Sequence, residues 1–409
     1  NAADAVTTSN NHVAVGFNSL SANTTGEKNT AIGSGTLAVN TTGEKNVAVG
    51  YVALEANTTG SQNTALGENA LADNISGGSN TAVGQNTLAT NTSGGANTAI
   101  GINALQNNTT ADNITAMGRN ALQNNTTGAE NVAVGAFAMT LNTTGAANTA
   151  FGFGALNANS SASHNTAMGR SALLDNTTGE YNTGIGRLAL QNNTTADSNT
   201  AVGYDALGSC TSGGENIAIG FRSGDNCTTG NKNVYVGDNA GNTHATGGNS
   251  IYIGRACNCS TNSVSQEIVL GADGVGKGTR TFFVNADNGV YHAGNTTTWS
   301  TVSDERIKKN IANNNEGLDI ITKLQPRNFE YKTEEEVKLT DLASVSHICT
   351  VKKTGTQLGF IAQELESVIP SAVYTDANGI KNVQPDNVIY YLINAIKELS
   401  AKVTALEAG

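Results

Sequence analysis

Charge, aromatic side chains and proline are all scarce in this 409-residue chain. Charged residues make up 13% of it, aromatic residues 5%, and only three residues are proline. That is too little large apolar side chain for an ordinary globular core of this size. A repeat architecture, in which small units bury their faces on one another, would remove the difficulty.

Long apolar runs and basic clusters are absent as well. No window approaches the roughly 18 consecutive apolar residues that a membrane helix needs, and no signal-peptide pattern opens the chain. The net charge is −11, without a basic run that could follow a phosphate backbone. We therefore expect no membrane span and no nucleic-acid partner. Because the chain begins with Asn rather than Met, we expect sequence upstream of it.

The scarce residues are distributed unevenly. The first 302 residues hold 28 charged side chains and the last 107 hold 27, whereas 42 of the 47 glycines lie in the first part and all three prolines in the second. The first part therefore relies on glycine for its turns. We predict a shaft over residues 1–280, a connector with Trp299 over 281–302, and a separate domain over 303–409.

An internal repeat of 17 residues fills the first part. Its anchor is the glycine of sequences such as "NTAIG", which recurs sixteen times without a slip, from Gly16 and Gly33 to Gly254 and Gly271. The residue before each anchor is apolar, the fourth residue after it is Leu or Met from Leu20 to Leu207, and the seventh is Asn from Asn23 to Asn193. Each unit is interpreted as strand, glycine, strand and an Asn-Thr-Thr-Gly turn.

Such a unit is too small to bury a core alone, so neighbouring units must stack. We predict a mainly β fold, a parallel β-solenoid (β-roll) of about sixteen 17-residue coils and on the order of 75 Å long at the strand spacing of about 4.8 Å. The anchor glycine suits a positive φ or a close backbone approach. The recurring Asn should form a ladder of side-chain amides. Helical hairpin repeats are excluded because no 3.6-residue apolar stripe is present.

The units "NTAIGSGTLA", "NVAVGYVALEA" and "NTAVGYDALGS" resemble the head repeats of trimeric autotransporter adhesins, and still more the repeats of phage tail fibres. The resemblance covers about residues 10 to 275 and implies a trimeric β-roll. Adhesin head repeats are usually a few residues shorter, and the membrane-anchoring β-barrel that ends those proteins has no counterpart in this sequence. A phage or virus fibre is therefore favoured over a bacterial adhesin.

The second part contains four blocks in order: "SDERIKKNI", "LDIITKLQPRNFEYK", "LGFIAQELESVIPSAV" and "VIYYLINAIKELSAKVTALE". They resemble the endosialidase-type intramolecular chaperone domain that closes many phage tail fibres. The resemblance implies an α+β domain that assembles three chains and then cuts itself off with a Ser/Lys dyad. By position, the cut falls between Val302 and Ser303, with Ser303 as nucleophile and Lys308 as its base.

A serine hydroxyl needs a base within hydrogen-bond reach, and a lysine serves only if burial or positive neighbours lower its pKa from about 10.4. Arg306 and Lys309 could help in that way. On a regular helix, side chains five residues apart point about 140° apart, so the stretch must bend for the dyad to form within one chain. The alternative makes Ser303 only a helix cap, because Ser-Asp-Glu-Arg is a good helix start.

The last apolar pattern predicts a coiled coil. Residues spaced alternately three and four apart form a seam of nearly three heptads, which a three-stranded bundle would bury; a helix packed inside one subunit is the alternative. The seam residues are Ile389, Leu392, Ile396, Leu399, Val403 and Leu406. Trimerisation there would also help near-identical coils to pair in register.

Two cysteines one period apart replace the ladder Asn, Cys210 and Cys227. On adjacent coils they lie at a distance that a disulfide can span, which favours an extracellular or virion-surface location; two buried free thiols are the alternative. Cys257 and Cys259 are too close in sequence for an easy local bridge. The scattered histidines have no ligand spacing to these cysteines, so we expect no metal and no cofactor.

These features together predict a structural and adhesive homotrimeric fibre of a phage or virus, located on the virion surface or otherwise extracellular. Its expected partners are a host cell-surface receptor or glycan and other tail or capsid proteins. No carboxylate pair recurs along the coils, so the expected chemistry is self-cleavage only, without a turnover enzyme. The alternative is a cellular surface adhesin built with the same assembly module.

Overall fold

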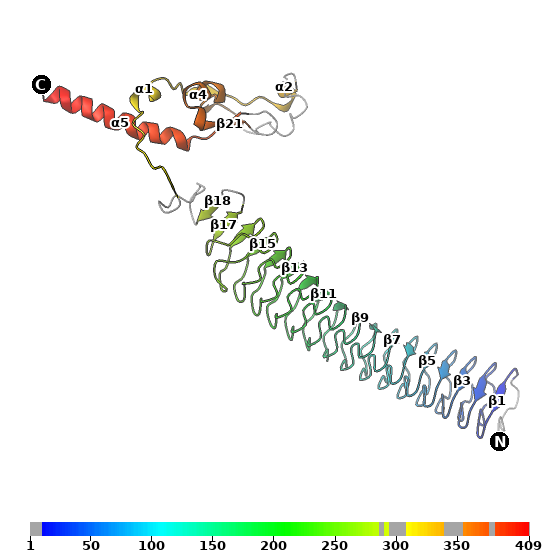
Figure 1. Cartoon of the computed structure of the whole chain (residues 1–409). Helices are drawn as coiled ribbons and strands as arrows, with labels where there is room; N and C mark the ends of the chain where they lie inside the picture. Colours follow the sequence, from blue (N-terminus) through cyan, green and yellow to red (C-terminus); the bar gives the residue numbers. More distant parts are fainter. Residues whose placement is uncertain (1–9, 286–289, 294–307, 339–354, 376–380, 409) are drawn as a thin grey trace. The chain divides into compact units, whose positions relative to one another are not determined.

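The computed structural model describes residues 10–285, 290–293, 308–338, 355–375 and 381–408. The chain divides into two compact units, Asn1–Val302 and Ser303–Gly409, and each is described by itself. The first unit is a column of stacked coils, and the second is a small α/β region that ends in a long helix (Figure 1).

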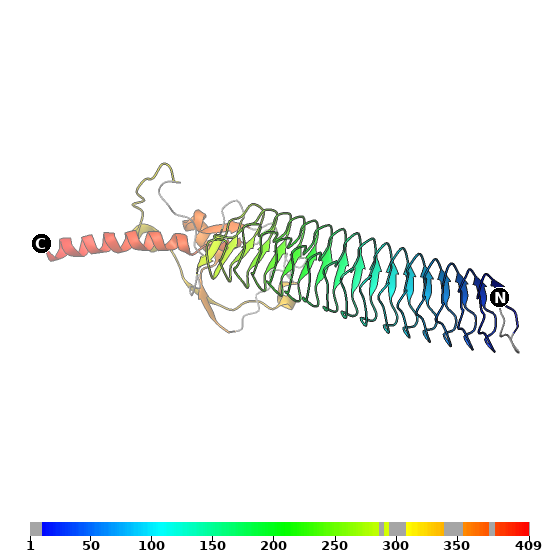
Figure 2. The same ribbon diagram turned by 90° about the horizontal axis from the view of Figure 1, so that it is seen from below.

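Sixteen three-residue strands, one per coil, run parallel along the first unit (Figure 2). Their bounds are β1 (Val13–Val15), β2 (Thr30–Ile32), β3 (Val47–Val49), β4 (Thr64–Leu66), β5 (Thr81–Val83), β6 (Thr98–Ile100), β7 (Thr115–Met117), β8 (Val132–Val134), β9 (Thr149–Phe151), β10 (Thr166–Met168), β11 (Thr183–Ile185), β12 (Thr200–Val202), β13 (Ile217–Ile219), β14 (Val234–Val236), β15 (Ile251–Ile253) and β16 (Ile268–Leu270). Equivalent residues pair from coil to coil, as Ala48 with Ala65. This confirms the predicted parallel β-solenoid.

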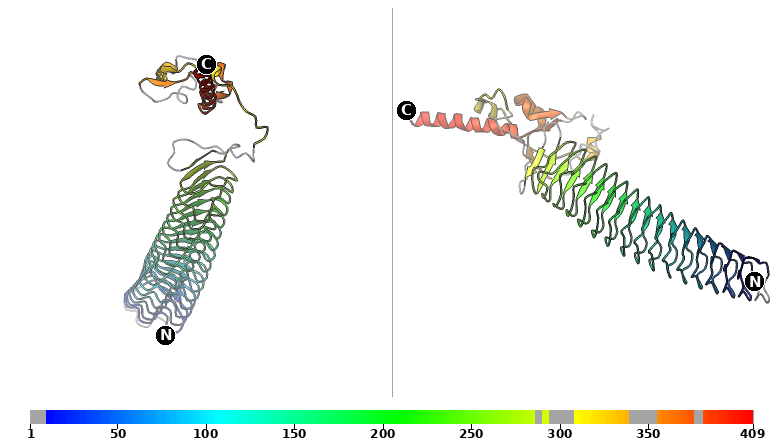
Figure 3. Two further views of the ribbon diagram at one scale, coloured as in Figure 1. Left: turned by 90° about the vertical axis from the view of Figure 1, so that its left-hand side faces the viewer. Right: turned by 60° about the horizontal axis from the view of Figure 1, so that its bottom comes forward.

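A final hairpin closes the column. Strand β17 (Thr281–Val284) pairs in parallel with β16, and β18 (Val290–Ala293) then pairs antiparallel with β17. The views in Figure 3 show the coils following one another without a break up to these strands.

Each coil contains one strand, so the prediction of two short strands per unit was wrong. The residues two, four and twelve positions after the anchor are left-handed instead, as Asn69 (φ 57°), Leu71 (φ 53°) and Ser79 (φ 60°) show. L-residues seldom adopt this conformation unless other contacts stabilise it. Here hydrogen bonds between coils do so: Asn69 donates its N–H to the Tyr51 carbonyl at 3.0 Å, and Leu71 donates to the Thr87 carbonyl at 3.0 Å.

Two separate constraints, the backbone conformation and the distance to the next coil, require glycine at the anchor position. At Gly118 the φ angle is +135°, and a Cβ atom would lie 2.6 Å from the carbonyl carbon of Gly135 on the next coil. Both the conformation and the close approach exclude a side chain. The same combination recurs at the other anchors, and this explains the unbroken period.

The core of the first unit consists of two rows of apolar side chains. The middle residue of each strand points inward and is usually Ala, and the Leu or Met four residues after the anchor packs against it. Leu54, Leu71 and Leu88 are fully buried and lie on successive coils, as predicted. Small side chains suffice because the coil is narrow.

Two ladders of Asn, both fully buried, run beside this core. In the predicted ladder, Asn57 donates from Nδ2 to Oδ1 of Asn40 at 2.7 Å and to the Gly60 carbonyl at 3.0 Å. In a second ladder, which was not predicted, Oδ1 of Asn46 accepts the N–H of Asn63 at 2.9 Å. The second ladder is the Asn of "NTAIG", which directly precedes twelve of the sixteen strands. The ladders pair polar groups that would be costly to bury alone.

The second unit contains short elements around one long helix. They are α1 (Leu318–Ile321), β19 (Arg327–Phe329), α2 (Glu334–Val337), β20 (Gln357–Gly359), α4 (Ala362–Val368), the 3₁₀ helix η3 (Pro370–Ala372), β21 (Val373–Thr375), β22 (Lys381–Val383) and α5 (Asp386–Glu407). Strands β19 and β20, and likewise β21 and β22, form antiparallel pairs. Leu365, Ile369, Ala372 and Val388 form its buried core.

Candidate assembly and cleavage site

The predicted cleavage residues, Val302 and Ser303, lie outside the described residues. Lys308, the predicted base, is described and is exposed on an irregular stretch of chain. The geometry of the dyad is therefore untested, and the roles of Ser303 and Lys308 stay predictions.

The stretch from residue 308 to residue 317 contains no helix. If Ser303 caps a helix, that helix does not reach Lys308.

The downstream end of this stretch is fastened to α5. Asn394 donates from Nδ2 to the carbonyls of Asn314, at 2.7 Å, and Glu316, at 3.1 Å. The Glu398 carboxylate accepts the N–H of Leu318 at 3.2 Å, at the start of α1. The last helix therefore positions the chain that leads back to the predicted cleavage point.

Two ion pairs link the strands β19 and β22 to α4. Arg327 on β19 forms a bidentate pair with Glu364 on α4, with nitrogen–oxygen distances of 3.1 and 3.0 Å. Lys381 on β22 lies 2.7 Å from both oxygens of Glu366. Bidentate geometry fixes orientation more than it adds stability at exposed positions.

Helix α5 presents its apolar seam to solvent in the single chain. Ile396 is 65% exposed and Leu406 is 83% exposed, and the other four seam residues are exposed as well. The seam is thus not packed inside one subunit, which was the alternative. A row of exposed apolar side chains at heptad spacing requires a partner, and the coiled coil itself stays a prediction.

The cysteines at the ladder positions are buried thiols in this structure. The Cys210 thiol donates to the Gly213 carbonyl at 3.2 Å, and the Cys227 thiol lies 3.6 Å from the Gly230 carbonyl. Each thiol thus takes over the intracoil bond of the ladder Asn. Hydrogen bonding to Cys227, and then burial, raise the pKa of Cys210. Both thiols are fully buried, so an oxidant from solvent would have to reach them, and the predicted disulfide would have to form, before the coils close.

A buried polar cluster at the end of the shaft was not predicted. Tyr235 and Tyr252 replace the core Ala of β14 and β15, and Tyr235 donates from its hydroxyl to Nδ1 of His244 at 2.7 Å. The other imidazole nitrogen faces the Val264 carbonyl at 2.8 Å, so it carries the proton. Burial lowers the pKa of His244. Glu267 accepts from the Tyr252 hydroxyl at 3.1 Å.

The sequence contains a signal for this cluster. The Leu row ends at Leu207, and glycine follows at the two equivalent positions, Gly224 and Gly241. A Cβ atom at Gly241 would lie 2.1 Å from the ring of Tyr235. Glycine replaces Leu in one row of the core where Tyr replaces Ala in the other, so the total volume of the packed side chains is kept.

Within the described part of the chain, no group of three or more His, Cys, Asp and Glu residues is arranged to hold a metal ion. None of the described helices combines the length and the apolar character needed to cross a membrane.

The fold and the site define a class: a β-solenoid shaft followed by a small α/β domain that ends in a helix. Residues 303–374 match the peptidase-family model described as chaperone of endosialidase. The first three of the four sequence blocks fall within the match, whereas α5 and the shaft lie outside it. No curated protein and no solved structure matches the chain. The likeness of the shaft repeats to adhesin heads and tail fibres stays a prediction.

Proposed function

We propose that the chain is one subunit of a homotrimeric fibre of a phage or virus that contacts a host surface. Its C-terminal domain guides assembly and then cuts itself off before Ser303. The observation that carries this proposal is the coincidence of two boundaries: the match to the chaperone of endosialidase begins at residue 303, and the second compact unit begins at Ser303.

Two exposed apolar surfaces support a fibre of several copies. One is the seam of α5, and the other is the outer face of the shaft strands, where Ile100, Met117 and Phe151 are 37%, 40% and 53% exposed. Apolar patches of this extent on a soluble chain mark interaction sites. Association at both places would hold three chains side by side over their length.

Self-cleavage would proceed by acyl transfer. The Ser303 hydroxyl attacks the carbonyl carbon of Val302 while Lys308 takes up its proton. The bond from that carbon to the Ser303 nitrogen then breaks as Lys308 returns the proton to the nitrogen, which leaves a free amine and an ester. Water then hydrolyses the ester, which leaves a carboxylate on Val302 and a free amine and hydroxyl on Ser303. A lysine acts as such a base only when its neutral form is favoured. Because Lys308 is exposed in the single chain, neighbouring copies would have to bury it, and cutting would follow assembly.

The test is the mass of the purified chain under denaturing conditions, with N-terminal sequencing of any small fragment. Ser303→Ala and Lys308→Ala should each stay full-length, whereas the control variant Lys332→Ala, an exposed lysine outside the junction, should still be cut at the same bond. A fragment that begins elsewhere, or cutting that persists in Lys308→Ala, would rule out the dyad. Virions examined by electron microscopy with an antibody to the shaft would test the location.

A further inference from the structure

The outward face of the shaft strands carries no charge over its whole length. In each strand the first and third residues point outward. The first is Thr, Val or Ile in all sixteen strands, from Val13 to Ile268, and the third is apolar in all sixteen, from Val15 to Leu270. A molecule that covers this face must present apolar side chains over sixteen coils, with the same spacing from one coil to the next. A second copy of the shaft, running parallel, meets both conditions.

Charged side chains flank this face at its two ends. The residue directly after the anchor glycine lies at one end of the strand, and four of the sixteen are arginine. The residues eleven and twelve positions after the anchor lie at the other end, separated from the next strand by the residue of the second Asn ladder. These two rows are called the arginine edge and the acidic edge below.

Three of the four arginines have no carboxylate partner among the described residues. Each instead lies over an aromatic ring: Arg119 is 4.9 Å from the ring centre of Phe137, and Arg170 is 5.8 Å from that of Phe153. Arg187 lies 5.6 Å from the ring centre of a tyrosine. These contacts hold the guanidinium groups in place while leaving their hydrogen-bond donors open.

All three units that contain these arginines have an acidic residue on the other edge, and so do four units without an arginine there, at Glu27, Glu44, Asp112 and Glu215. The units of Arg119, Arg170 and Arg187 contain Glu130, Glu180 and Asp197 at the eleventh or twelfth position. The fourth arginine, Arg255, already forms an ion pair with Asp273 in its own chain, and its unit contains Ser265 and Gln266 there. Arg255, which has a carboxylate partner in its own chain, thus has no acidic residue in its unit on the acidic edge.

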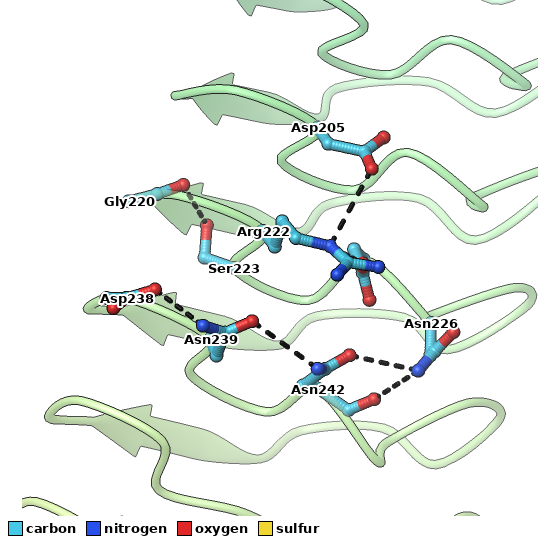
Figure 4. Close-up of polar contacts among 9 residues, drawn as sticks. Asp205, Gly220, Arg222, Ser223, Asn226, Asp238, Asn239 and Asn242 are labelled. Atoms are coloured by element: carbon cyan, nitrogen blue, oxygen red, sulfur yellow. Dashed lines mark hydrogen bonds and ion pairs between the residues drawn. The ribbon is translucent and has the colours of Figure 1, made fainter.

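Arg222, the second residue after its anchor glycine, likewise has carboxylate partners in its own chain and no acidic residue in its unit on the acidic edge. It bonds Asp225 at 2.7 Å and lies 3.8 Å from Asp205, as Figure 4 shows for Asp205, and its unit contains Asn231 and Lys232 on the acidic edge. The correlation between a missing partner in the chain and an acid on the far edge indicates pairing between chains.

We propose that the arginine edge of one copy meets the acidic edge of the next and sets the register of the fibre. The pairs are Arg119 with Glu130, Arg170 with Glu180 and Arg187 with Asp197. Such a head-to-tail contact closes into a ring of three when each copy is rotated by a third of a turn from the one before it. The inference rests on the proposed homotrimer and adds to it the residues that align the copies.

The apolar face cannot supply this alignment, because it repeats every coil. In register, all three arginines meet an acid. After a shift of one coil, either Arg119 faces Ala146 and Ala147 or Arg170 faces Ser163 and His164, and one pair is lost. Exposed pairs add little energy, but a mispaired charge in an interface is costly, so they select among registers of equal apolar contact.

The test uses charge reversal in the full chain. One variant combines Arg119→Glu with Arg170→Glu, a second combines Glu130→Arg with Glu180→Arg, and a third carries all four changes. Each two-residue variant should lower the midpoint of thermal dissociation of the trimer, and the four-residue exchange should recover at least half of the loss. Added salt should raise the midpoint of the two-residue variants and lower that of the unmodified chain.

Arg255→Glu is the matched control, because its partner lies in its own chain; the midpoint should respond to it equally with and without the other changes. If a reversed variant does not fold, Arg170→Gln and Glu180→Gln should reduce the salt dependence. Reversals without effect, or an exchange that recovers nothing, would overturn the pairing. Sedimentation of the unmodified chain as a monomer would instead overturn the homotrimer.

Discussion

The shaft and the C-terminal unit bury apolar side chains by different means. In the shaft, Leu71 and Leu88 are fully buried by coils that lie next to them in sequence, and buried Asn side chains bond from coil to coil. In the C-terminal unit the buried core is small, and α5 leaves Ile396 and Leu399 exposed. The difference teaches that stacking of neighbouring coils is enough to build the core of the shaft, whereas the second unit leaves the seam of its longest helix exposed within the chain.

The largest effect is expected when the seam of α5 is made polar, because this tests whether assembly depends on that helix. Ile396→Lys with Leu399→Lys should abolish trimers, because six lysines would meet in one bundle core. The expected products are monomers or aggregated, misregistered shafts, measured by sedimentation. Lys397→Ala, between them on the same helix, is the control and should keep the trimer. Intact trimers in the double variant would show that the shaft assembles without the helix.

A side chain at an anchor glycine tests whether the shaft depends on its coil-to-coil approach. Gly118→Ala adds a Cβ atom at 2.6 Å from the next coil and forces an unfavourable φ. The strain and the overlap should cost about 2 to 6 kcal/mol in the free energy of unfolding, measured with denaturant. Gly154→Ala is the matched control, because its nearest neighbour would lie at 3.6 Å and Ala256 already occupies the equivalent site. Equal effects of the two changes would contradict this account.

The buried ladder can be tested with a change of one atom. In Asn108→Asp, a carboxylate oxygen replaces the Nδ2 group that donates to Asn91 at 2.8 Å and to the Ala111 carbonyl at 3.1 Å. Facing two acceptors without solvent, it should cost about 3 kcal/mol at neutral pH, and less as the pH falls and the carboxyl group takes up a proton. The same change at the partly buried Asn107 should cost less. A pH-independent loss would exclude a buried charge as the cause.

The smallest expected effect concerns the end of the shaft. Burial lowers the pKa of His244 below its unfolded value of about 6.5. Above that pH both states are neutral; as the pH falls through it the unfolded chain takes up a proton first, and stability decreases by up to about 1.4 kcal/mol per pH unit. The imidazole is contacted by the neutral hydroxyl of Tyr235. The nearby carboxylate of Glu267 bonds to the Tyr252 hydroxyl.

His244→Asn restores the ladder residue and should flatten this dependence, measured as hydrogen exchange in the last coils between pH 7 and pH 5. His164→Asn is the control, since His164 is exposed and stacks on Tyr181. An unchanged slope in His244→Asn would assign the acid sensitivity to another group.

The period, the anchor glycine, the Leu row and one Asn ladder could be predicted because each depends on spacing alone. The single strand per coil could not, since left-handed Leu71 and Asn69 are stabilised by hydrogen bonds to other coils and not by local preference. The inward direction of Ala and the outward direction of Ile100 also follow from stacking. In the sequence the three residues of a strand such as Thr98–Ile100 do not show which side chain points inward, because Ala and Ile are both apolar.

The candidate site was predictable only through resemblance. The exposed seam of α5 follows from heptad spacing, but the bonds of Asn394 and Glu398 to residues 314–318 join positions about 80 residues apart, which no local pattern encodes. The Tyr235–His244 contact likewise depends on which side chains stack across coils.

The antiparallel strand β18 has a consequence for growth of the fibre. A column of parallel coils ends in a row of open N–H and C=O groups, which can template another chain in the way that amyloid fibrils elongate. Strand β18 covers β17 from Thr281 to Val284 with a strand of opposite direction. A further 17-residue coil running in the direction of the shaft would therefore meet an antiparallel strand at this tip, and the parallel template that every preceding coil offers to the next one is missing there.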